Sequence, residues 1–346
     1  MSVSTVVLVV VVVAFAWNLG VHYTGAVMGM PFAAGAIRLW PAQALIAGCV
    51  ILGATFASGR VEELVGLRIL PTGRIAAPTA IVIVAAAGAL TAFYNWRRIP
   101  TSTIQILVFC VVGAGLAADL PVDWGAIWRL VVVWVCAPVV AFGLGFAFTR
   151  LLDAVVPLEQ ARAATGAALR GRGRGGPAIG AGAAGAGAGA AVRALPLLLV
   201  AVGIAASFVL GGNDVANATG ALIMVNLLPL MAAGLVGGVA MAVGALTWGR
   251  RILRTVAFDV VTMDLTTASA AQGVQALVVL AAITQGFFTS MNQALIGAMA
   301  GTGVARGRAT IHRRQLVGIL RGWLFGPVSG FALAYAGEWL ARAIAG

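Results

Sequence analysis

Lysine is absent from this sequence, and charged residues of any kind are scarce. Charged side chains make up 9% of the 346 residues, whereas 61% are hydrophobic, and the mean hydropathy is +1.03. Soluble globular domains carry about 25% charged residues. The scarcity of charge therefore excludes a soluble domain and predicts an all-α membrane protein that crosses the bilayer many times.

Cysteine and histidine are also scarce. Cys49, Cys110 and Cys136 lie scattered in apolar runs, and His22 and His312 are 290 residues apart. These residues give neither a disulfide framework nor the ligand spacing of a metal site. The sequence also lacks a nucleophile–base pair and a phosphate-binding loop of the nucleotide type. We therefore expect neither an enzyme nor a bound cofactor.

Acidic residues are outnumbered by basic ones, 10 against 22, which gives a net charge of +12. All the basic residues are arginines, and they lie in short loops between apolar runs. This placement indicates membrane topology as the role of the charge, and we expect no nucleic-acid partner.

The apolar runs predict ten membrane spans. We interpret the first run as a span because it lacks the basic start and the small-residue cleavage site of a signal peptide. Two short, glycine-rich runs open with polar residues and are predicted to be half-helices or re-entrant hairpins; they cover 101–118 and 289–305. The other predicted spans are 3–29 with an interruption at 18–20, 41–59, 77–94, 127–152, 194–224 with an interruption at 211–217, 227–248, 268–287 and 315–343.

The hydrophilic segment 153–193 separates five spans from five spans. Its core, 171–191, is nearly all Gly, Ala and Arg, a composition that cannot bury a hydrophobic core. We therefore predict three parts: an N-terminal transmembrane repeat at 1–152, a flexible linker at 153–193 and a C-terminal transmembrane repeat at 194–346.

The two halves resemble each other. Four segments align in the same order at offsets of 195, 188, 188 and 189 residues, namely 18–26 with 213–221, 100–105 with 288–293, 113–117 with 301–305, and 134–138 with 323–327. Four matches at nearly one offset indicate a duplication. Because each half has an odd number of spans, the fold is predicted to be two inverted repeats of about five spans each, with broken or re-entrant helices.

The arginines also predict the orientation. If the linker is cytoplasmic, sixteen arginines lie on the cytoplasmic side and five on the other, with Arg321 inside the last span. The positive-inside rule favours this arrangement. We expect a multi-pass protein of the cell membrane, with the central linker in the cytoplasm and both termini outside.

The interruption at 211–217 carries the most unusual chemistry in the chain. Asp214 is an acidic residue well inside an apolar run, and Asn213 and Asn217 flank it. A carboxylate at bilayer depth costs about 2.5–3.5 kcal/mol on insertion scales, so such residues usually serve an ion or a polar substrate. Asp214 is predicted to ligate Na⁺ or to carry a transported proton. The alternative is a structural cluster that only hydrogen-bonds a helix break.

The matching interruption in the first half has lost its acid. Asn18, His22 and Thr24 remain, and Leu19 stands where the second half has Asp214. Either these residues contact the substrate or ion, or this half is a decayed repeat that only packs. His22 is either a titrating group or a hydrogen-bonded core residue.

Hydroxyls and amides open both short spans: Thr101, Ser102, Thr103 and Gln105 in one, and Ser290, Asn292 and Gln293 in the other. Together with free backbone N–H groups at a helix start, such side chains suit an oxyanion. The alternative is ordinary helix N-capping by serine and threonine. Arg321 either balances a buried anion or extends to the cytoplasmic face.

Two sets of candidate site residues follow. The candidate substrate-binding residues are Ser102, Thr103, Gln105, Ser290, Asn292, Gln293, Thr24 and Thr219. The candidate cation ligands are Asn18, Asn213, Asp214 and Asn217.

Several of these motifs resemble one family. Segment 212–218, Gly-Asn-Asp-Val-Ala-Asn-Ala, resembles the Gly-Ala-Asn-Asp-Val-Ala-Asn-Ala signature of the PiT family of inorganic phosphate transporters. Segments 100–105 and 288–293 are similar to the Pro-Val-Ser-Thr-Thr-His motif that this family carries in each half. The turn at 304–307 and the Trp-x-x-x-Pro spans are also similar, so the resemblance covers nearly the whole chain.

The resemblance implies cotransport of phosphate with Na⁺ or H⁺, an inverted-repeat fold and a homodimer. It implies ion and phosphate contacts at Asn213, Asp214, Asn217, Ser102, Thr103 and Ser290. The chain departs from the family pattern where it has Leu19, His22, Gln105, Gln293 and the pair Met291 and Asn292.

We therefore expect a secondary transporter of inorganic phosphate, driven by a cation that is transported with it. Two alternatives stay open. One is a transporter of sulfate or another oxyanion on the same fold. The other is a non-transporting membrane sensor or scaffold, which the altered first-half motif would suit.

Overall fold

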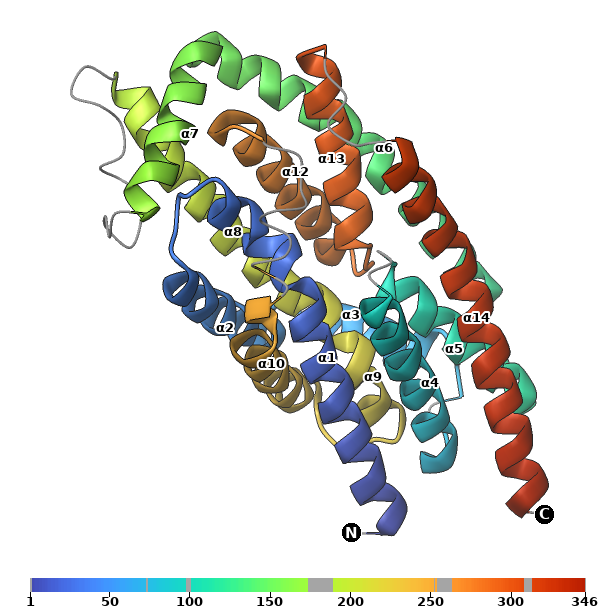
Figure 1. Ribbon diagram of the computed structural model, residues 1–346. Helices are drawn as coiled ribbons and strands as arrows, with labels where there is room; N and C mark the ends of the chain where they lie inside the picture. The colour runs from blue at the N-terminus through green and yellow to red at the C-terminus, as the bar shows by residue number, and fades with distance from the viewer. Residues whose placement is uncertain are drawn as a thin grey trace.

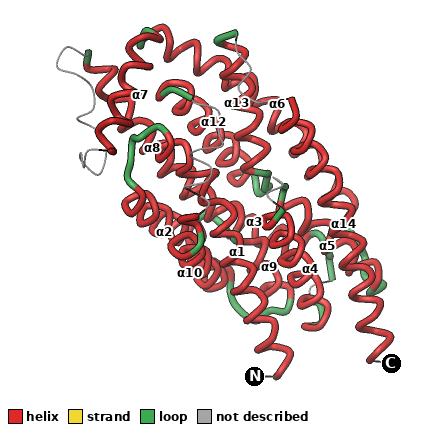
Figure 2. The backbone as a smooth tube through the Cα atoms, in the orientation of Figure 1, coloured by secondary structure: helices red, strands yellow, loops and turns green. Residues whose placement is uncertain are grey.

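The computed structural model describes residues 2–72, 74–97, 101–173, 189–251, 253, 263–307 and 313–345. Within these ranges the chain forms helices joined by loops (Figure 1, Figure 2). This all-helical architecture agrees with the predicted fold class.

The first half contains seven elements. Four are long helices, one is a short helix, and two form a compact segment between α2 and α4. They are α1 (Val3–Ala33), α2 (Leu39–Phe56), α3 (Gly59–Glu63), the π-helical turn η1 (Leu64–Arg68), α4 (Ala77–Trp96), α5 (Thr103–Ala117) and α6 (Trp124–Val155).

The second half ends in the same order of helices as the first, a long helix, a 15-residue helix and a long helix. Its elements are α8 (Ala190–Asp214), α9 (Ala216–Met224), α10 (Leu230–Thr247), α12 (Leu265–Thr284), α13 (Met291–Ala305) and α14 (Arg313–Ala345). Between the halves lies α7 (Leu158–Gly173), so the predicted flexible linker begins with a helix. Most of the glycine-rich linker core, 174–188, lies outside the described residues.

Seven helices in the described part of the chain are long and apolar enough to cross a membrane, counting α8 and α9 as one. They are α1, α2, α4, α6, the α8–α9 pair, α10 and α12. Helices α5 and α13 have only 15 residues each, about 22 Å of helix. Both begin at residues that are fully buried, so the two short spans start inside the protein, as predicted for half-helices.

The predicted interruption at 18–20 is wrong, because α1 runs without a break from Val3 to Ala33. Contacts with other helices explain why Asn18 and Gly20 occur in an unbroken helix. The Asn18 side chain is bonded sideways to Asn95 and to the Gly88 carbonyl. Gly20 allows α1 and α10 to pack closely and does not form a turn, since a Cβ atom there would collide with the Met241 backbone of α10.

The interruption predicted at 211–217 is present but much smaller. The helix is broken only at Val215, whose φ of −59° and ψ of −37° are still helical. The chain therefore turns between α8 and α9 without an unwound stretch. Asp214 is the last residue of α8, and Asn217 lies in the first turn of α9.

The segment of α3 and η1 was not predicted from the sequence, which we interpreted as a loop between two spans. It packs against α9 and α10. This packing buries Glu62 completely, although its neighbour Glu63 is only partly buried.

Helices of the two halves pack on each other in matched pairs. Helix α6 packs on α13, and α14 packs on α5; α2 packs on α8, and α10 packs on α1. Glycines at matching positions allow two of these contacts. A Cβ atom at Gly113 would collide with the Phe331 carbonyl of α14, and one at Gly301 would collide with the Phe142 carbonyl of α6.

The two chain ends lie at the same end of the bundle, and α7 lies at the opposite end (Figure 1). In this view α5 occupies the lower part of the bundle and α13 the upper part. Their N-termini meet in the middle of the bundle (Figure 1), where the Gln293 amide donates to the Gln105 oxygen.

Candidate functional site

Asn213 joins α8 to the loop before α13. Its side-chain amide donates to the Thr289 carbonyl at 2.8 Å, and its oxygen accepts from the Thr289 N–H at 3.2 Å. The side chain thus satisfies both backbone groups of one residue. All these groups are buried. This pair of hydrogen bonds fixes the start of α13 beside the end of α8.

Asp214 is joined to the start of α5 through Asn217. The Asn217 amide donates to one Asp214 oxygen at 3.3 Å and to the Thr103 hydroxyl at 3.2 Å. The other Asp214 oxygen accepts from Asn213 at 2.8 Å. Asp214 and Thr103 are both fully buried. The single carboxylate of this cluster is therefore tied to the beginnings of both short helices.

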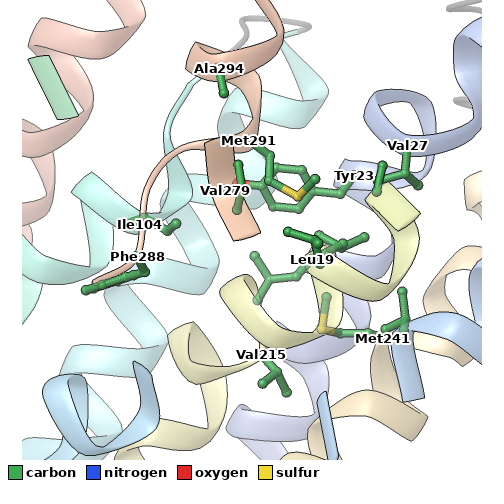
Figure 3. Packing of buried hydrophobic residues seen from close by; sticks show 14 of the residues in the cluster. Leu19, Tyr23, Val27, Ile104, Val215, Met241, Val279, Phe288, Met291 and Ala294 are labelled. Atoms are coloured by element: carbon green, nitrogen blue, oxygen red, sulfur yellow. The ribbon is translucent and has the colours of Figure 1, made fainter. Parts of the chain in front are cut away.

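Tyr23 also belongs to this cluster, although the sequence did not single it out. Its hydroxyl lies 2.7 Å from the Thr103 hydroxyl, and it interacts with the Asp214 carboxylate. Tyr23 is fully buried. Its ring lies close to Met291 and Val279, and Leu19 lies between this group and Met241 (Figure 3). Leu19 thus fills with apolar contacts the position that corresponds to Asp214.

Ser102 and Ser290 cap α5 and α13. Each hydroxyl accepts from the backbone N–H three residues later, at 3.3 Å. Both serines are therefore N-caps, which was the alternative to anion binding in the sequence analysis. A serine oxygen that accepts this bond keeps its hydrogen free for another acceptor. At each start, a hydroxyl and the free N–H groups of the first turn thus share one end of the helix.

Gln105 and Gln293 meet where the two short helices face each other. The Gln293 amide donates to the Gln105 oxygen at 3.3 Å. These glutamines occupy matching positions 188 residues apart, and both are buried. The positive ends of two helix dipoles are therefore directed toward the same interior region, which suits an anion.

Asn292 makes a second bridge between the halves. Its amide donates to the Thr101 carbonyl at 3.2 Å and lies 3.3 Å from Nε2 of His22. Nδ1 of His22 is hydrogen-bonded to the Asn95 oxygen. The Asn95 amide in turn donates to the Asn18 oxygen at 3.0 Å. His22 and Asn18 therefore belong to a chain of polar side chains that ends at the start of α13.

Several buried oxygens in this region have no hydrogen-bond partner among the residues that the structure describes. They are the hydroxyls of Thr101 and Thr289 and the side-chain carbonyls of Asn217 and Gln293. Each such atom costs about 1–3 kcal/mol when it stays unpaired. The Asn217 oxygen adjoins the Asp214 carboxylate, and oxygen donors around a buried carboxylate suit a cation such as Na⁺.

Three of the predicted site residues, Asn18, Thr24 and Thr219, make their hydrogen bonds away from Asp214 and the two helix starts. Asn18 contacts Asn95 and the Gly88 carbonyl, so none of its hydrogen bonds reaches Asp214. The Thr24 hydroxyl donates to the Gly20 carbonyl of its own helix at 2.7 Å. The other predicted residues are gathered by α5, α8, α9 and α13; they are Ser102, Thr103, Gln105, Asn213, Asp214, Asn217, Ser290, Asn292 and Gln293.

Thr219 lies beside a second buried acid that the sequence did not reveal. Its hydroxyl is 2.7 Å from a Glu62 oxygen and 3.0 Å from the Val215 carbonyl. The other Glu62 oxygen has no partner in the described part of the chain. The sequence gave no warning of this burial, because Glu62 adjoins Glu63 and Arg60 in a segment that is not strongly apolar.

Two glutamines of α12 were also missed. The Gln272 amide donates to the Ala26 carbonyl of α1 at 3.1 Å, and the Gln275 amide donates to the Met291 carbonyl at 3.2 Å. The signal was available, since both amides interrupt an apolar run. Arg321, in contrast, is exposed, so it does not balance an anion in the buried cluster.

The profile of the phosphate transporter family matches residues 19–334, which is most of the chain and includes every site residue named above except Asn18. The chain belongs to this family. Its members are transporters, and the seven apolar helices accord with a multi-pass membrane protein. The family resemblance seen in the sequence motifs is thereby confirmed.

Relatives in the same family differ in their named substrates. The chain is 26% identical to the sulfate permease CysP of Bacillus subtilis, over 93% of this chain and 83% of the relative. It is also 26% identical to the "Putative phosphate permease TK2061" of Thermococcus kodakarensis, over 95% of this chain and 96% of the relative. A solved structure titled "The sodium-dependent phosphate transporter" has the same fold, with a TM-score of 0.84 at 20% identity, covering 99% of this chain and 100% of that one.

Proposed function

We propose that this protein is a secondary transporter that moves inorganic phosphate together with Na⁺ or H⁺ by alternating access. One observation carries the proposal: the Asn217 amide bridges the Asp214 carboxylate and the Thr103 hydroxyl at the start of α5. A cation held at Asp214 and an anion held at the two helix starts would share this contact. Binding of one would then favour binding of the other.

The anion would lie between the N-termini of α5 and α13. Its donors would be the hydroxyls of Ser102, Thr103 and Ser290, the amides of Gln105, Asn292 and Gln293, and the free N–H groups of the two first turns. Neutral donors at two helix ends stabilise an anion without a permanent positive charge. Such a site releases its anion when the accompanying cation leaves.

The cation would lie at Asp214. This carboxylate is fully buried and has no basic partner among the described ion pairs. An isolated charge of this kind is strongly destabilising, so a proton or a metal ion is expected to neutralise it. The Asn217 oxygen and nearby hydroxyls supply further ligands for Na⁺. Neither ion is a resident cofactor; each would be cargo.

The two halves, 1–152 and 194–346, would act as inverted repeats joined by the linker 153–193. The exchanged packing of α6 on α13 and α14 on α5 supports this proposal, and so do the matched glycines of those contacts. Two bundles related in this way present the same site to either side of the membrane in turn. The position of both termini at one end, opposite α7, supports a linker and termini on opposite sides of the membrane (Figure 1), and the arginine distribution favours the cytoplasm for the linker.

An unpaired oxygen at the proposed anion site favours phosphate over sulfate. The Gln293 oxygen at the anion site is buried and has no donor among the described residues. Phosphate at neutral pH carries a hydroxyl that can donate to this oxygen, whereas sulfate carries none. A site with a buried unpaired acceptor discriminates against a ligand that cannot supply the hydrogen. The sulfate permease of Bacillus subtilis keeps sulfate as the second candidate substrate.

The test is uptake of labelled phosphate into proteoliposomes, with a Na⁺ gradient, a pH gradient or neither. We expect uptake to require one of the two gradients and excess unlabelled sulfate to compete poorly. Strong competition by sulfate would change the substrate but keep the mechanism. Phosphate binding without uptake under any gradient would indicate a sensor or scaffold instead.

Topology and assembly need separate tests. Cysteines introduced at Arg172 and Gly346 are expected to label from opposite sides of a cell-membrane vesicle, and labelling from the same side would contradict the orientation. A homodimer is expected from the family resemblance. Light scattering of the purified protein, corrected for detergent, measures whether two chains are present.

A further inference from the structure

The first half of the site carries the imidazole of His22 where the second half has Asn217. The imidazole is half-buried, unlike the fully buried Asp214 carboxylate. It is held between Asn95 of α4 and Asn292 of α13. The directions of the hydrogen bonds on both sides define its protonation state.

One end of the hydrogen-bonded chain is fixed by the Gly88 carbonyl, which can only accept. The Asn18 amide donates to this carbonyl at 3.4 Å, so the Asn18 oxygen must face Asn95. The Asn95 amide donates to that oxygen at 3.0 Å. The Asn95 oxygen is therefore the atom that faces His22, and Nδ1 of His22 must carry the hydrogen.

The other end is fixed by the Thr101 carbonyl, which also can only accept. The Asn292 amide donates to it at 3.2 Å and faces Nε2 of His22 at 3.3 Å. Its two hydrogens serve these two acceptors, so Nε2 must accept and carries no hydrogen. His22 is thus neutral, with its hydrogen on Nδ1, and the assignment depends on two backbone carbonyls and not on the naming of amide atoms.

A proton added to Nε2 cannot be accommodated in this arrangement. Its hydrogen would point at the Asn292 amide hydrogens, so the Asn292 side chain would have to turn or leave. Turning the amide brings its oxygen toward both the imidazolium and the Thr101 carbonyl, and two acceptors repel each other. Protonation of His22 therefore breaks the contact between Asn292 and Thr101 that joins the starts of the two short helices.

We propose that His22 is a proton-binding site whose protonation is coupled to anion binding between α5 and α13. The added positive charge would lie beside the first turn of α13, where it attracts an oxyanion. The broken contact with Thr101 would free the Asn292 amide to donate to the anion instead. This inference rests on the proposed transport function and adds a second coupling group in the half whose first helix has Leu19 at the position of Asp214.

Few other charges act on His22. The elements packed on α1 carry no ionisable group in α9, α10, α12 or the described part of α13. The ionisable residues of α1 itself and of the remaining elements on it are Tyr23, Cys49 of α2, Tyr94 of α4, and Arg193 and Asp214 of α8, with Arg97 at the end of α4. Asp214 interacts with Tyr23, whose ring lies edge-on to the imidazole with 4.6 Å between ring centroids.

The first test needs no substrate. The sequence has one other histidine, His312, so the His312→Gln variant labelled with ¹⁵N-histidine gives the NMR signals of His22 alone. We expect the Nδ1–H tautomer at high pH and conversion to the imidazolium as the pH falls. An Nε2–H tautomer, or an imidazole that stays neutral at every pH at which the protein is folded, would overturn the inference even if phosphate is transported.

The second test measures coupling. Purified wild-type protein is expected to take up protons when inorganic phosphate is added, and His312→Gln is expected to behave in the same way. His22→Asn should still bind phosphate but take up fewer protons than wild type. Because phosphate itself titrates, the affinity of wild type relative to His22→Asn is the quantity to follow. It should rise as pH falls, by at most about tenfold per pH unit for one linked proton.

The outcomes separate the two proposals. Equal proton uptake and equal pH dependence in wild type and His22→Asn would overturn the coupling role of His22 and leave phosphate transport standing. Failure of wild type to bind or transport any oxyanion would remove the proposed function. The tautomer and titration of His22 would still show whether the proton site exists.

Discussion

The two halves of this protein share their packing but not their polar chemistry. Gly113 and Gly301 make equivalent close contacts with α14 and α6, and Ser102 and Ser290 cap α5 and α13 in the same way. Around the first helix of each half, the residues differ. The second half has a buried carboxylate tied to both short helices, whereas the first half has Leu19 in an apolar cluster.

This difference separates the packing requirements, which both halves share, from the requirement for a charged ligand, which only one half meets. Backbone contacts between helices tolerate no added atom, so glycines at crossings persist in both halves. A charged ligand is needed only once if both halves face one shared site. The second position can then take an apolar side chain or a different titratable group. The predictions below test this division between a symmetric scaffold and an asymmetric site.

The largest effect is expected from the single carboxylate. Asp214→Asn keeps the size of the side chain, removes its charge and replaces one of the two oxygens that accept from Asn213 and Asn217 by a donor. Coupled phosphate uptake should fall by at least about 100-fold, since losing one partner of a buried charge pair costs about 3–5 kcal/mol. Proteoliposome uptake measures it. Leu19→Asp is the matched change in the first half and should not restore uptake in the double variant. Uptake by Asp214→Asn near the wild-type rate would contradict the assignment of the cation site.

A second contrast concerns ion pairs at the far ends of the short helices. At the end of α13, Arg306 is buried between Asp153 and Asp264, with a side chain 9% exposed. At the end of α5, the matching contact is exposed: Arg342 bonds Asp119 at 3.0 Å, and Asp119 is 89% exposed.

Removing these arginines should therefore have unequal effects. Arg306→Leu should lower the free energy of unfolding by about 3–5 kcal/mol, because two carboxylates lose a buried partner. Arg342→Leu should lower it less, because the Arg342 side chain and its partner Asp119 are exposed, although Arg342 also pairs with the buried Glu338 carboxylate at 3.4 Å. Thermal and denaturant unfolding in detergent measure both variants. Equal losses of stability in the two variants would contradict the difference in burial between the two ion-pair clusters.

The Arg306 cluster also predicts a pH effect. Burial alone would raise the pKa of Asp264, but hydrogen bonds from Thr266 and Thr267 and the charge of Arg306 outweigh it and lower the pKa. A lowered pKa in the folded state adds stability above the unfolded value of about 3.9. That stability is lost as pH falls through the folded value. The difference in free energy of unfolding between wild type and Arg306→Leu should therefore be largest near neutral pH and should decrease below about pH 4.

The matched glycines should respond alike. Gly113→Ala and Gly301→Ala each place a methyl group against a backbone carbonyl of the partner helix, and overpacking of this kind costs about 1–3 kcal/mol. Gly143 of α6 is the control, because nothing lies within 4 Å of a Cβ atom there. Gly143→Ala should be neutral or stabilising. A loss confined to one of the two matched sites would indicate that the scaffold is less symmetric than its contacts suggest.

The sequence predicted those features that depend on local signals. Apolar length located the spans, and the polar starts of α5 and α13 followed from serine caps and amides. The interruption in α1 was predicted wrongly because Asn95 and Met241, distant in sequence, satisfy Asn18 and accommodate Gly20. Glu62 was missed for the same reason, since only the packing of α9 shows that it is buried. Contacts between distant helices decide these points, and periodicity does not reveal them.

The smallest effect separates capping from substrate binding at the two serines. Ser102→Ala and Ser290→Ala each remove one N-cap, so each should cost about 1 kcal/mol of stability. If the serine hydrogens also donate to the anion, the apparent KM for phosphate uptake should rise in both variants. Ser→Thr at either position keeps the hydroxyl and the cap, so it should restore both stability and KM. A stability loss with an unchanged KM would leave capping as the whole role of that serine, and a change of KM at Ser290 alone would place the anion nearer the half that carries Asp214.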